Sequence, residues 1–118
     1  MNKFRLVALM DDWHMSARLA KLSTFHSYNL EFIESIFNLS NEGKKVLLII
    51  DMDILKLEEP LSVVKFKNGK SIFVLGYARK LDTSKMTFFN NYGYDMVLNR
   101  NKLLKNIESV VRKITSAN

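Results

Sequence analysis

Two apolar runs, each closed by acidic residues, dominate the pattern of hydrophobic and polar positions along the chain. Residues 6–10 (LVALM) lead into a pair of aspartates, and residues 46–50 (VLLII) lead into an Asp-Met-Asp triplet. Apolar runs without polar alternation are typical of strands buried on both faces, as in parallel sheets. The pattern therefore predicts two buried strands with carboxylates at their carboxyl ends, which is the edge where open α/β sheets bind ligands.

The rest of the pattern predicts that strands and helices alternate along the chain. Strands are expected at residues 3–10, 28–33, 45–50, 71–75 and 95–98. Helices are expected from Asp12 or Trp13 onward and at residues 35–40, 60–67, 83–92 and 101–115. Five alternations in 118 residues predict a single domain, residues 1–118, built as a flavodoxin-like doubly wound α/β fold with a five-stranded parallel sheet and helices on both faces. Periodicity alone does not give the strand order; if it is 2-1-3-4-5, the first and third strands, which end in the acids, are neighbours at the switch point.

Apolar spacing within the helices predicts which face of each helix is buried. In the first helix one stripe is expected to hold Trp13, Ala17 and Ala20, with Met15, Leu19 and Leu22 beside it. The last helix keeps near-ideal apolar spacing from Leu103 to Ile114. The helix at 83–92 carries a set too broad for one buried stripe: Met86, Phe88, Phe89 and Tyr92. Burial in the core is the favoured interpretation of this set, and partial exposure at an interaction face is the alternative.

The predicted strand order brings Asp11, Asp12 and Asp51 onto one crevice. Converging carboxylates repel one another unless a cation joins them. The arrangement therefore predicts a divalent-ion site at the edge of the sheet. An alternative is that Asp11 and Asp12 only cap the first helix, which accounts for one of them but not for Asp51.

Composition narrows the class of protein. The chain has no cysteine, so disulfides and cysteine-ligated zinc are ruled out, and it has no apolar run near the roughly 20 residues that cross a bilayer. A cytoplasmic protein without a membrane segment is expected. The net charge is +6, but the basic residues are dispersed and form no run of five, so direct nucleic-acid binding is not favoured.

The chain resembles, over its whole length, the receiver domains of bacterial two-component response regulators, the CheY-like superfamily. Residues 9–13 (LMDDW) are similar to the acid pair that follows the first receiver strand, and Asp51 is similar to the phosphoacceptor aspartate. Residues 96–100 (MVLNR) lie where the family has its fifth strand and an invariant lysine, and Gly93 matches the glycine before that strand.

The resemblance implies a domain of a two-component phosphorelay. Asp11 and Asp12 would hold Mg²⁺ together with Asp51 and the backbone carbonyl of Asp53, because Mg²⁺ prefers oxygen ligands. Asp51 would accept a phosphoryl group from a sensor histidine kinase or act with another signalling protein. The chain would be at most a self-modifying phosphoacceptor without substrate turnover. A homodimer through the face made by the fourth helix, fifth strand and fifth helix is a further expectation.

Several positions depart from the receiver pattern. Gly76 stands where the family has a switch serine or threonine, Arg100 replaces the conserved lysine, and Asn101 and Leu55 stand where the family has prolines. Val97 stands at the position of the switch aromatic. Arginine keeps the positive charge but differs from lysine in reach and geometry. The second hypothesis is therefore a pseudo-receiver, a protein-interaction module whose output does not depend on phosphorylation. A DNA-associated regulator without its own DNA-binding motif is a third, weaker idea.

Two further motifs have plainer interpretations. The Asp51-Met52-Asp53 triplet fits the Asp-x-Asp motif of haloacid-dehalogenase phosphatases and metal-dependent glycosyltransferases, but those folds need a longer chain. His14 lies beside the acids without metal-ligand spacing and is expected to face solvent.

Overall fold

The computed structural model describes residues 4–35, 45–54, 72–91 and 93–116. The predicted helix at 60–67 lies outside the described residues, as does the one at 35–40 from residue 36 onward. The position of Tyr92 is also outside them.

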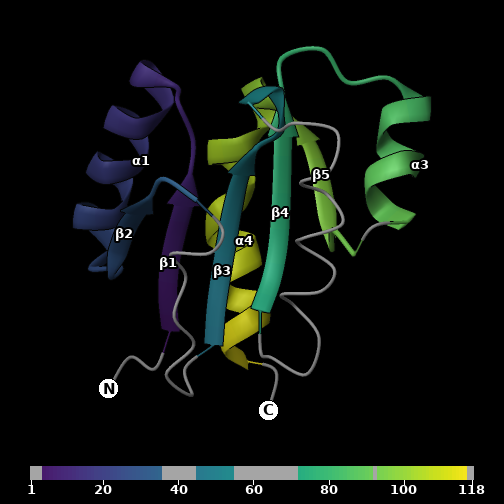
Figure 1. Ribbon diagram of the computed structural model, residues 1–118. Helices are drawn as coiled ribbons and strands as arrows, with labels where there is room; N and C mark the ends of the chain where they lie inside the picture. Colours follow the sequence, from purple (N-terminus) through teal and green to yellow (C-terminus); the bar gives the residue numbers. More distant parts are fainter. Residues whose placement is uncertain (1–3, 36–44, 55–71, 92, 117–118) are drawn as a thin grey trace.

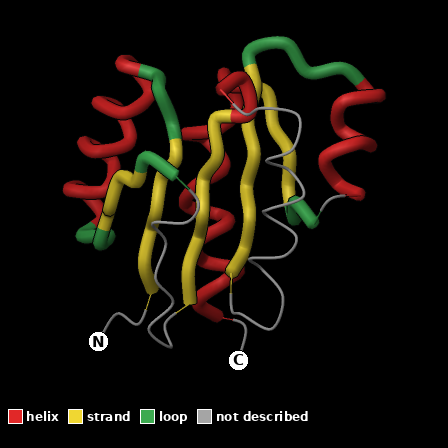
Figure 2. Tube along the Cα trace, in the orientation of Figure 1, coloured by secondary structure: helices red, strands yellow, loops and turns green. Residues whose placement is uncertain are grey.

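The described residues form one five-stranded, all-parallel sheet in the order β2-β1-β3-β4-β5, which confirms the predicted flavodoxin-like α/β fold. Its strands are β1 (Phe4–Leu9), β2 (Leu30–Ile33), β3 (Lys45–Asp51), β4 (Ile72–Ala78) and β5 (Met96–Asn99). Figure 2 shows these strands as a single layer with helices around it. The three central strands are almost entirely buried, as their continuous apolar runs predict.

Helices lie on both faces of the sheet (Figure 1). The helices are α1 (Trp13–His26), α3 (Thr83–Asn91) and α4 (Leu103–Ser116), with short 3₁₀ turns at η2 (Met52–Ile54) and η3 (Arg100–Lys102). Helices α1 and α4 pack against one face, and on the other face Phe89 of α3 and Leu81, which precedes α3, pack against the core. None of these helices is long and apolar enough to cross a membrane.

Burial along the helices confirms one predicted face and corrects two others. In α4 the apolar residues face the core as predicted; they are Leu103, Leu104, Ile107, Val110, Val111 and Ile114. In α1 the buried side chains are Met15 and Leu19, while Trp13 is 87% exposed, so the stripe predicted through Trp13 was wrong. In α3 only Phe89 packs on the core; Met86 and Phe88 are exposed, so the favoured interpretation of full burial was also wrong.

Strand β4 extends further than the sequence suggested. It was expected to stop at Leu75 with Gly76 closing it, but its pairing with β3 and β5 continues to Ala78. Gly76 therefore lies inside a central strand, and Ala78 is the residue at the strand end. The missing side chain of Gly76 makes room for Met52 and Tyr94, since a Cβ there would lie 2.4 Å from Met52 Sδ and 2.9 Å from the Tyr94 ring.

The register of the sheet gathers the chain's polar strand ends at one edge. Asp51 is paired with Tyr77 across β3 and β4, and Ala78 is paired with Asn99 across β4 and β5. Because all strands are parallel, the residues that follow β1, β3, β4 and β5 meet at the carboxyl edge.

Gly76→Ala should destabilise the domain by about 1–3 kcal/mol, because the added methyl overpacks a filled core. Urea unfolding followed by circular dichroism measures the change. Combining Gly76→Ala with Met52→Ala should recover part of the loss, as expected for residues that share the same space. An unchanged midpoint in Gly76→Ala would contradict the close packing described for this strand.

Candidate functional site

Asp12 is the centre of the polar cluster at the carboxyl edge. It is only 4% exposed and caps α1, with Oδ1 accepting the Met15 N–H at 3.1 Å. Arg100 grips the same carboxylate with two hydrogen bonds, Nε to Oδ2 at 2.7 Å and Nη2 to Oδ1 at 2.9 Å. The Tyr77 hydroxyl donates to Oδ2 at 3.3 Å. Both oxygens of Asp12 are therefore already occupied by groups of the protein.

The bridge to Arg100 sets the charge state of Asp12. Hydrogen bonding by Arg100 lowers the pKa of Asp12 from 3.8 to about 2, against the opposing effect of burial. The same hydrogen bond raises the pKa of Arg100. Bidentate arginine–carboxylate pairs are among the strongest polar contacts in proteins, so Asp12 and Arg100 form a fixed ion pair at this edge.

Arg79 adds a second positive charge from the residue after β4. Its guanidinium lies 3.8 Å from Asp12 Oδ2 and 3.6 Å from Asp53 Oδ2, and its backbone N–H donates to Asp53 Oδ2 at 3.0 Å. The side chain is 57% exposed, so its ion pairs are weaker than that of Arg100. Two arginines thus balance the carboxylates of Asp12 and Asp53.

Asp51 differs from Asp12 and Asp53 because it is buried and forms no ion pair with any of the described residues. It is 1% exposed; Oδ1 accepts the Asp53 N–H at 3.1 Å, and Oδ2 has no hydrogen-bond partner among the described residues. Burial raises the pKa of Asp51, and the charges of Asp53 and Asp12 add to the rise, while the backbone N–H groups of Asp53 and Asp11 oppose it. Burial likewise raises the pKa of Tyr77, with Asp51 and Asp12 contributing.

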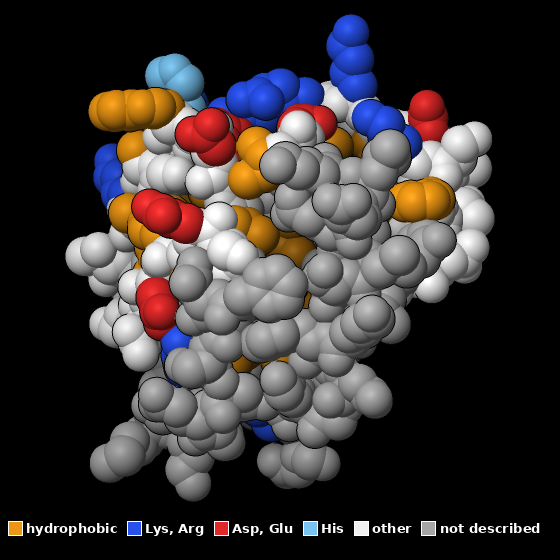
Figure 3. Space-filling model, in the orientation of Figure 1, with side chains coloured by type: hydrophobic (Ala, Val, Ile, Leu, Met, Phe, Trp, Pro, Cys, Tyr) orange, Lys and Arg blue, Asp and Glu red, His pale blue; other side chains and the backbone are white. Residues whose placement is uncertain are grey.

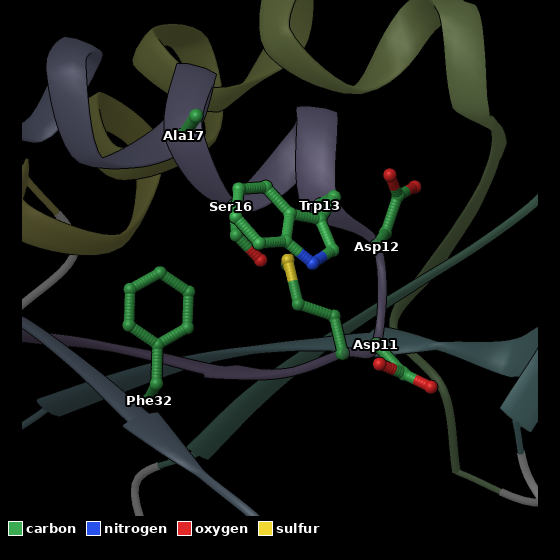
Figure 4. A pocket seen from close by; sticks show the side chains of 7 residues that line it. Asp11, Asp12, Trp13, Ser16, Ala17 and Phe32 are labelled. Atoms are coloured by element: carbon green, nitrogen blue, oxygen red, sulfur yellow. The ribbon is translucent and has the colours of Figure 1, made fainter.

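Asp11 does not join this cluster. Its side chain is exposed and lines a groove of about 440 Å³ together with Met10, Asp12, Trp13, Ser16, Ala17 and Phe32. In Figure 4 the carboxylates of Asp11 and Asp12 leave the chain in different directions. The acid pair therefore does not converge on one point in this conformation.

The oxygen donors at this edge, as they are arranged, do not fit the predicted magnesium ion. Mg²⁺ needs oxygen ligands in near-octahedral geometry. Asp12 is held by Arg100, Asp11 points elsewhere, and the Asp53 carboxylate faces Arg79. No group of three acidic, histidine or cysteine side chains in the described ranges is arranged to hold a metal. Oδ2 of Asp51 is buried and accepts no hydrogen bond from the described residues.

The sequence located the site but missed part of its chemistry. The strand order predicted Asp11, Asp12 and Asp51 on one crevice; the structure places Asp12 and Asp51 there and Asp11 outside it. Arg100 and Asp53, which the resemblance suggested, also lie in the cluster, whereas Gly76 is packed against Met52 and Tyr94 in the core. Neither Tyr77 nor Arg79 was among the predicted site residues, although both lie at the carboxyl end of β4, the strand next to β3. A strand drawn to Ala78 would have placed both at the carboxyl edge. His14 is exposed, as expected.

Comparisons with protein-family models, with curated proteins and with solved structures give no match for this chain. The class defined by the molecule itself is an α/β protein with an acid–arginine cluster at the carboxyl edge of its parallel sheet. Its function has to be inferred from that cluster.

Neutralising Asp12 and Asp51 should change stability in opposite directions at pH 7. The pKa of Asp12 is lowered from 3.8 to about 2, which corresponds to about 2 kcal/mol of folding free energy that Asp12→Asn removes. The raised pKa of Asp51 means that its charge disfavours folding, so Asp51→Asn should stabilise the domain.

Urea unfolding between pH 7 and pH 2 separates the two effects. The stability that Asp12 contributes is complete above its unfolded pKa near 3.8 and is lost as the pH falls toward 2, so wild type and Asp12→Asn should converge in acid. A loss of stability in Asp51→Asn at pH 7 would mean that Asp51 has a counter-charge in the folded protein.

Proposed function

We propose that this chain is an atypical receiver-like signalling domain that works as a protein-interaction module, with its acid site closed by its own arginines and its output independent of phosphorylation. The bidentate Asp12–Arg100 ion pair carries the proposal, because it fills the position where a receiver would need an open carboxylate. The burial of Asp51 supports it further, since a phosphoryl donor must reach that side chain.

The receiver-like class rests on fold and acid placement together. The strand order 2-1-3-4-5 is common to many proteins of different function, so it supports the class only in combination with the acids after β1 and β3. The absence of a switch hydroxyl favours the phosphorylation-independent form. Ala78, which ends β4, has no hydroxyl, and neither does Gly76 two residues before it.

Charge balance supports a closed site. Arg79 and Arg100 face Asp12 and Asp53, so their guanidinium groups supply the positive charge that the sequence led us to expect from a metal ion. A divalent ion would have to displace Arg100 from a short, two-point contact that is largely screened from water. A site of this kind stabilises the structure and does not bind a metal ion in this closed form.

Phosphoryl acceptance at Asp51 is a second candidate, because Oδ2 of Asp51 is buried without a partner among the described residues. Such an oxygen could form the acyl phosphate bond if the site opened. In that case Mg²⁺ and a sensor histidine kinase would be the expected cofactor and partner. The raised pKa of Asp51 and its burial weigh against ready reaction in the closed conformation.

The proposed partner is another signalling protein in the cytoplasm. Met86 and Phe88 give α3 an exposed apolar surface next to β5. The face formed by α3, β5 and α4 is therefore the proposed contact surface, and a homodimer through it belongs to the same proposal.

Wild-type protein incubated with Mg²⁺ and acetyl phosphate or phosphoramidate should give no hydroxylamine-labile adduct under conditions that label an ordinary receiver domain. Intact-mass spectrometry measures the adduct, and the ordinary receiver serves as the positive control. An adduct that Asp51→Asn abolishes would refute the proposed function and establish the second candidate.

Removing the arginine should open the site to metal. Wild type should show no saturable change in the fluorescence of Trp13, the sole tryptophan, at millimolar Mg²⁺. Arg100→Gln frees Asp12 and should give a saturable change, and Arg100→Lys, which keeps the charge but not the two-point contact, a smaller one. Arg112→Gln, on α4 and paired with Glu108, is the matched control and should behave as wild type. Equal Mg²⁺ binding by wild type and Arg100→Gln would show that the arginine does not close the site.

A further inference from the structure

A second cavity lies on the other side of the two arginines. It measures about 410 Å³ and is lined by Arg79, Asn99, Arg100, Asn101 and Lys102; we call it the arginine pocket. It is formed by the end of β4 and by the η3 turn that joins β5 to α4. Lys and Arg side chains gather at this end of the molecule, which is the top of Figure 3.

The lining of the arginine pocket has the chemistry of an anion site. Three of its side chains are cationic and two are carboxamides, and no acidic residue lines it among those described. The Lys102 ammonium has no ion-pair partner within the described ranges. Asn99 occupies the N-cap position of η3 without capping it through its side chain, so its amide is available to a ligand. Guanidinium and ammonium groups in one concave site are the usual means of binding phosphate.

The pocket is connected to the acid cluster through shared arginines. Asp12 occupies Nε and Nη2 of Arg100, and a guanidinium has five N–H donors, so donors remain for a second anion. The Arg79 guanidinium lies 3.6–3.8 Å from the carboxylates of Asp12 and Asp53 and is more than half exposed. Because these ion pairs are weak, Arg79, which also lines the pocket, can contact an anion bound there. An anion bound here would compete with Asp12 for the same positive charge.

We propose that the arginine pocket binds a small phosphate-bearing molecule non-covalently and that binding weakens the Asp12–Arg100 bridge. The inference rests on the proposed function, in which that bridge closes the acid site. It supplies a ligand-driven way of opening the site that needs no covalent phosphorylation. The cavity volume falls within the range of small-molecule sites and exceeds what a single phosphate fills, so a phosphate ester or a diphosphate is the expected class.

A nucleic acid is the less favoured ligand for these cations. They are confined to one cavity, its lining contains no aromatic side chain for base stacking, and the other basic residues are scattered along the chain. A nucleic-acid backbone would need a longer basic track.

Isothermal titration calorimetry of the full chain with inorganic pyrophosphate and with adenosine diphosphate tests the binding. Wild type should bind at least one of them saturably with one site. Lys102→Ala and Arg79→Gln should each weaken binding about tenfold, the loss expected for one charge-assisted contact. Lys105→Ala removes a neighbouring exposed charge that does not line the pocket and should leave the affinity unchanged.

Nuclear magnetic resonance tests the effect on the bridge. The Nε–H signal of Arg100 should shift on addition of pyrophosphate in wild type and should not shift in Lys102→Ala at the same concentration. An Arg100 signal that stays in place while the ligand binds would overturn the coupling between the pocket and the bridge.

Other outcomes overturn the proposal of a phosphate site. Absence of saturable binding would do so, and so would an equal loss in Lys105→Ala, which would indicate diffuse attraction to a basic protein. Affinity that grows with the length of a single-stranded oligonucleotide and ignores Lys102→Ala would replace the small ligand with a nucleic acid. These results are distinguishable from failure of the proposed function, which is decided by phosphoryl labelling at Asp51 and not by any binding at Lys102.

Discussion

The ion pair between Asp12 and Arg100 is the interaction on which the carboxyl edge of this sheet depends. It joins the start of α1 to the turn after β5, so it ties the end of β1 to the end of the edge strand β5 across the carboxyl edge of the sheet. Breaking a buried pair leaves an uncompensated charge, which is far more costly than the net gain from making the pair. The contact therefore fixes the position of α1, of Arg100 and of the Tyr77 hydroxyl together.

That ion pair also explains why the acids of one cluster have different properties. Asp12 stays ionised because the Arg100 guanidinium is hydrogen-bonded to it. Asp51 is buried with only backbone N–H donors, and its Oδ2 accepts no hydrogen bond from the described residues. Perturbed carboxylates often mark functional sites, but a structural ion-pair network perturbs them equally well. Here the shift in the pKa of Asp12 comes from the ion-pair network, whereas the rise in the pKa of Asp51 comes mainly from burial.

The sequence predicted the sheet more fully than the site. The alternation of strands and helices and the buried face of α4 followed from long, strongly periodic segments, whereas the strand order was assumed from the flavodoxin-like arrangement and is confirmed. The acids at the ends of β1 and β3 followed from the apolar runs before them. The roles of Tyr77 and Arg79 did not, because the end of β4 is set by pairing with β3 and β5 and not by its own residues. The sequence predicted a metal ion as the counter-charge of these acids, whereas among the described residues the positive charge beside Asp12 comes from Arg79 and Arg100. Charge alone does not distinguish a metal from an arginine that is distant in sequence.

The distance along the chain between Asp12 and Arg100 has a consequence for folding. The two residues are 88 positions apart, so during synthesis the helix cap leaves the ribosome long before its counter-charge exists. Closing a loop of that length is entropically unfavourable until the intervening strands have paired. The bridge can form only as β5 docks against β4. The ion pair is thus expected to form late in folding, when the last strand of the sheet is in place.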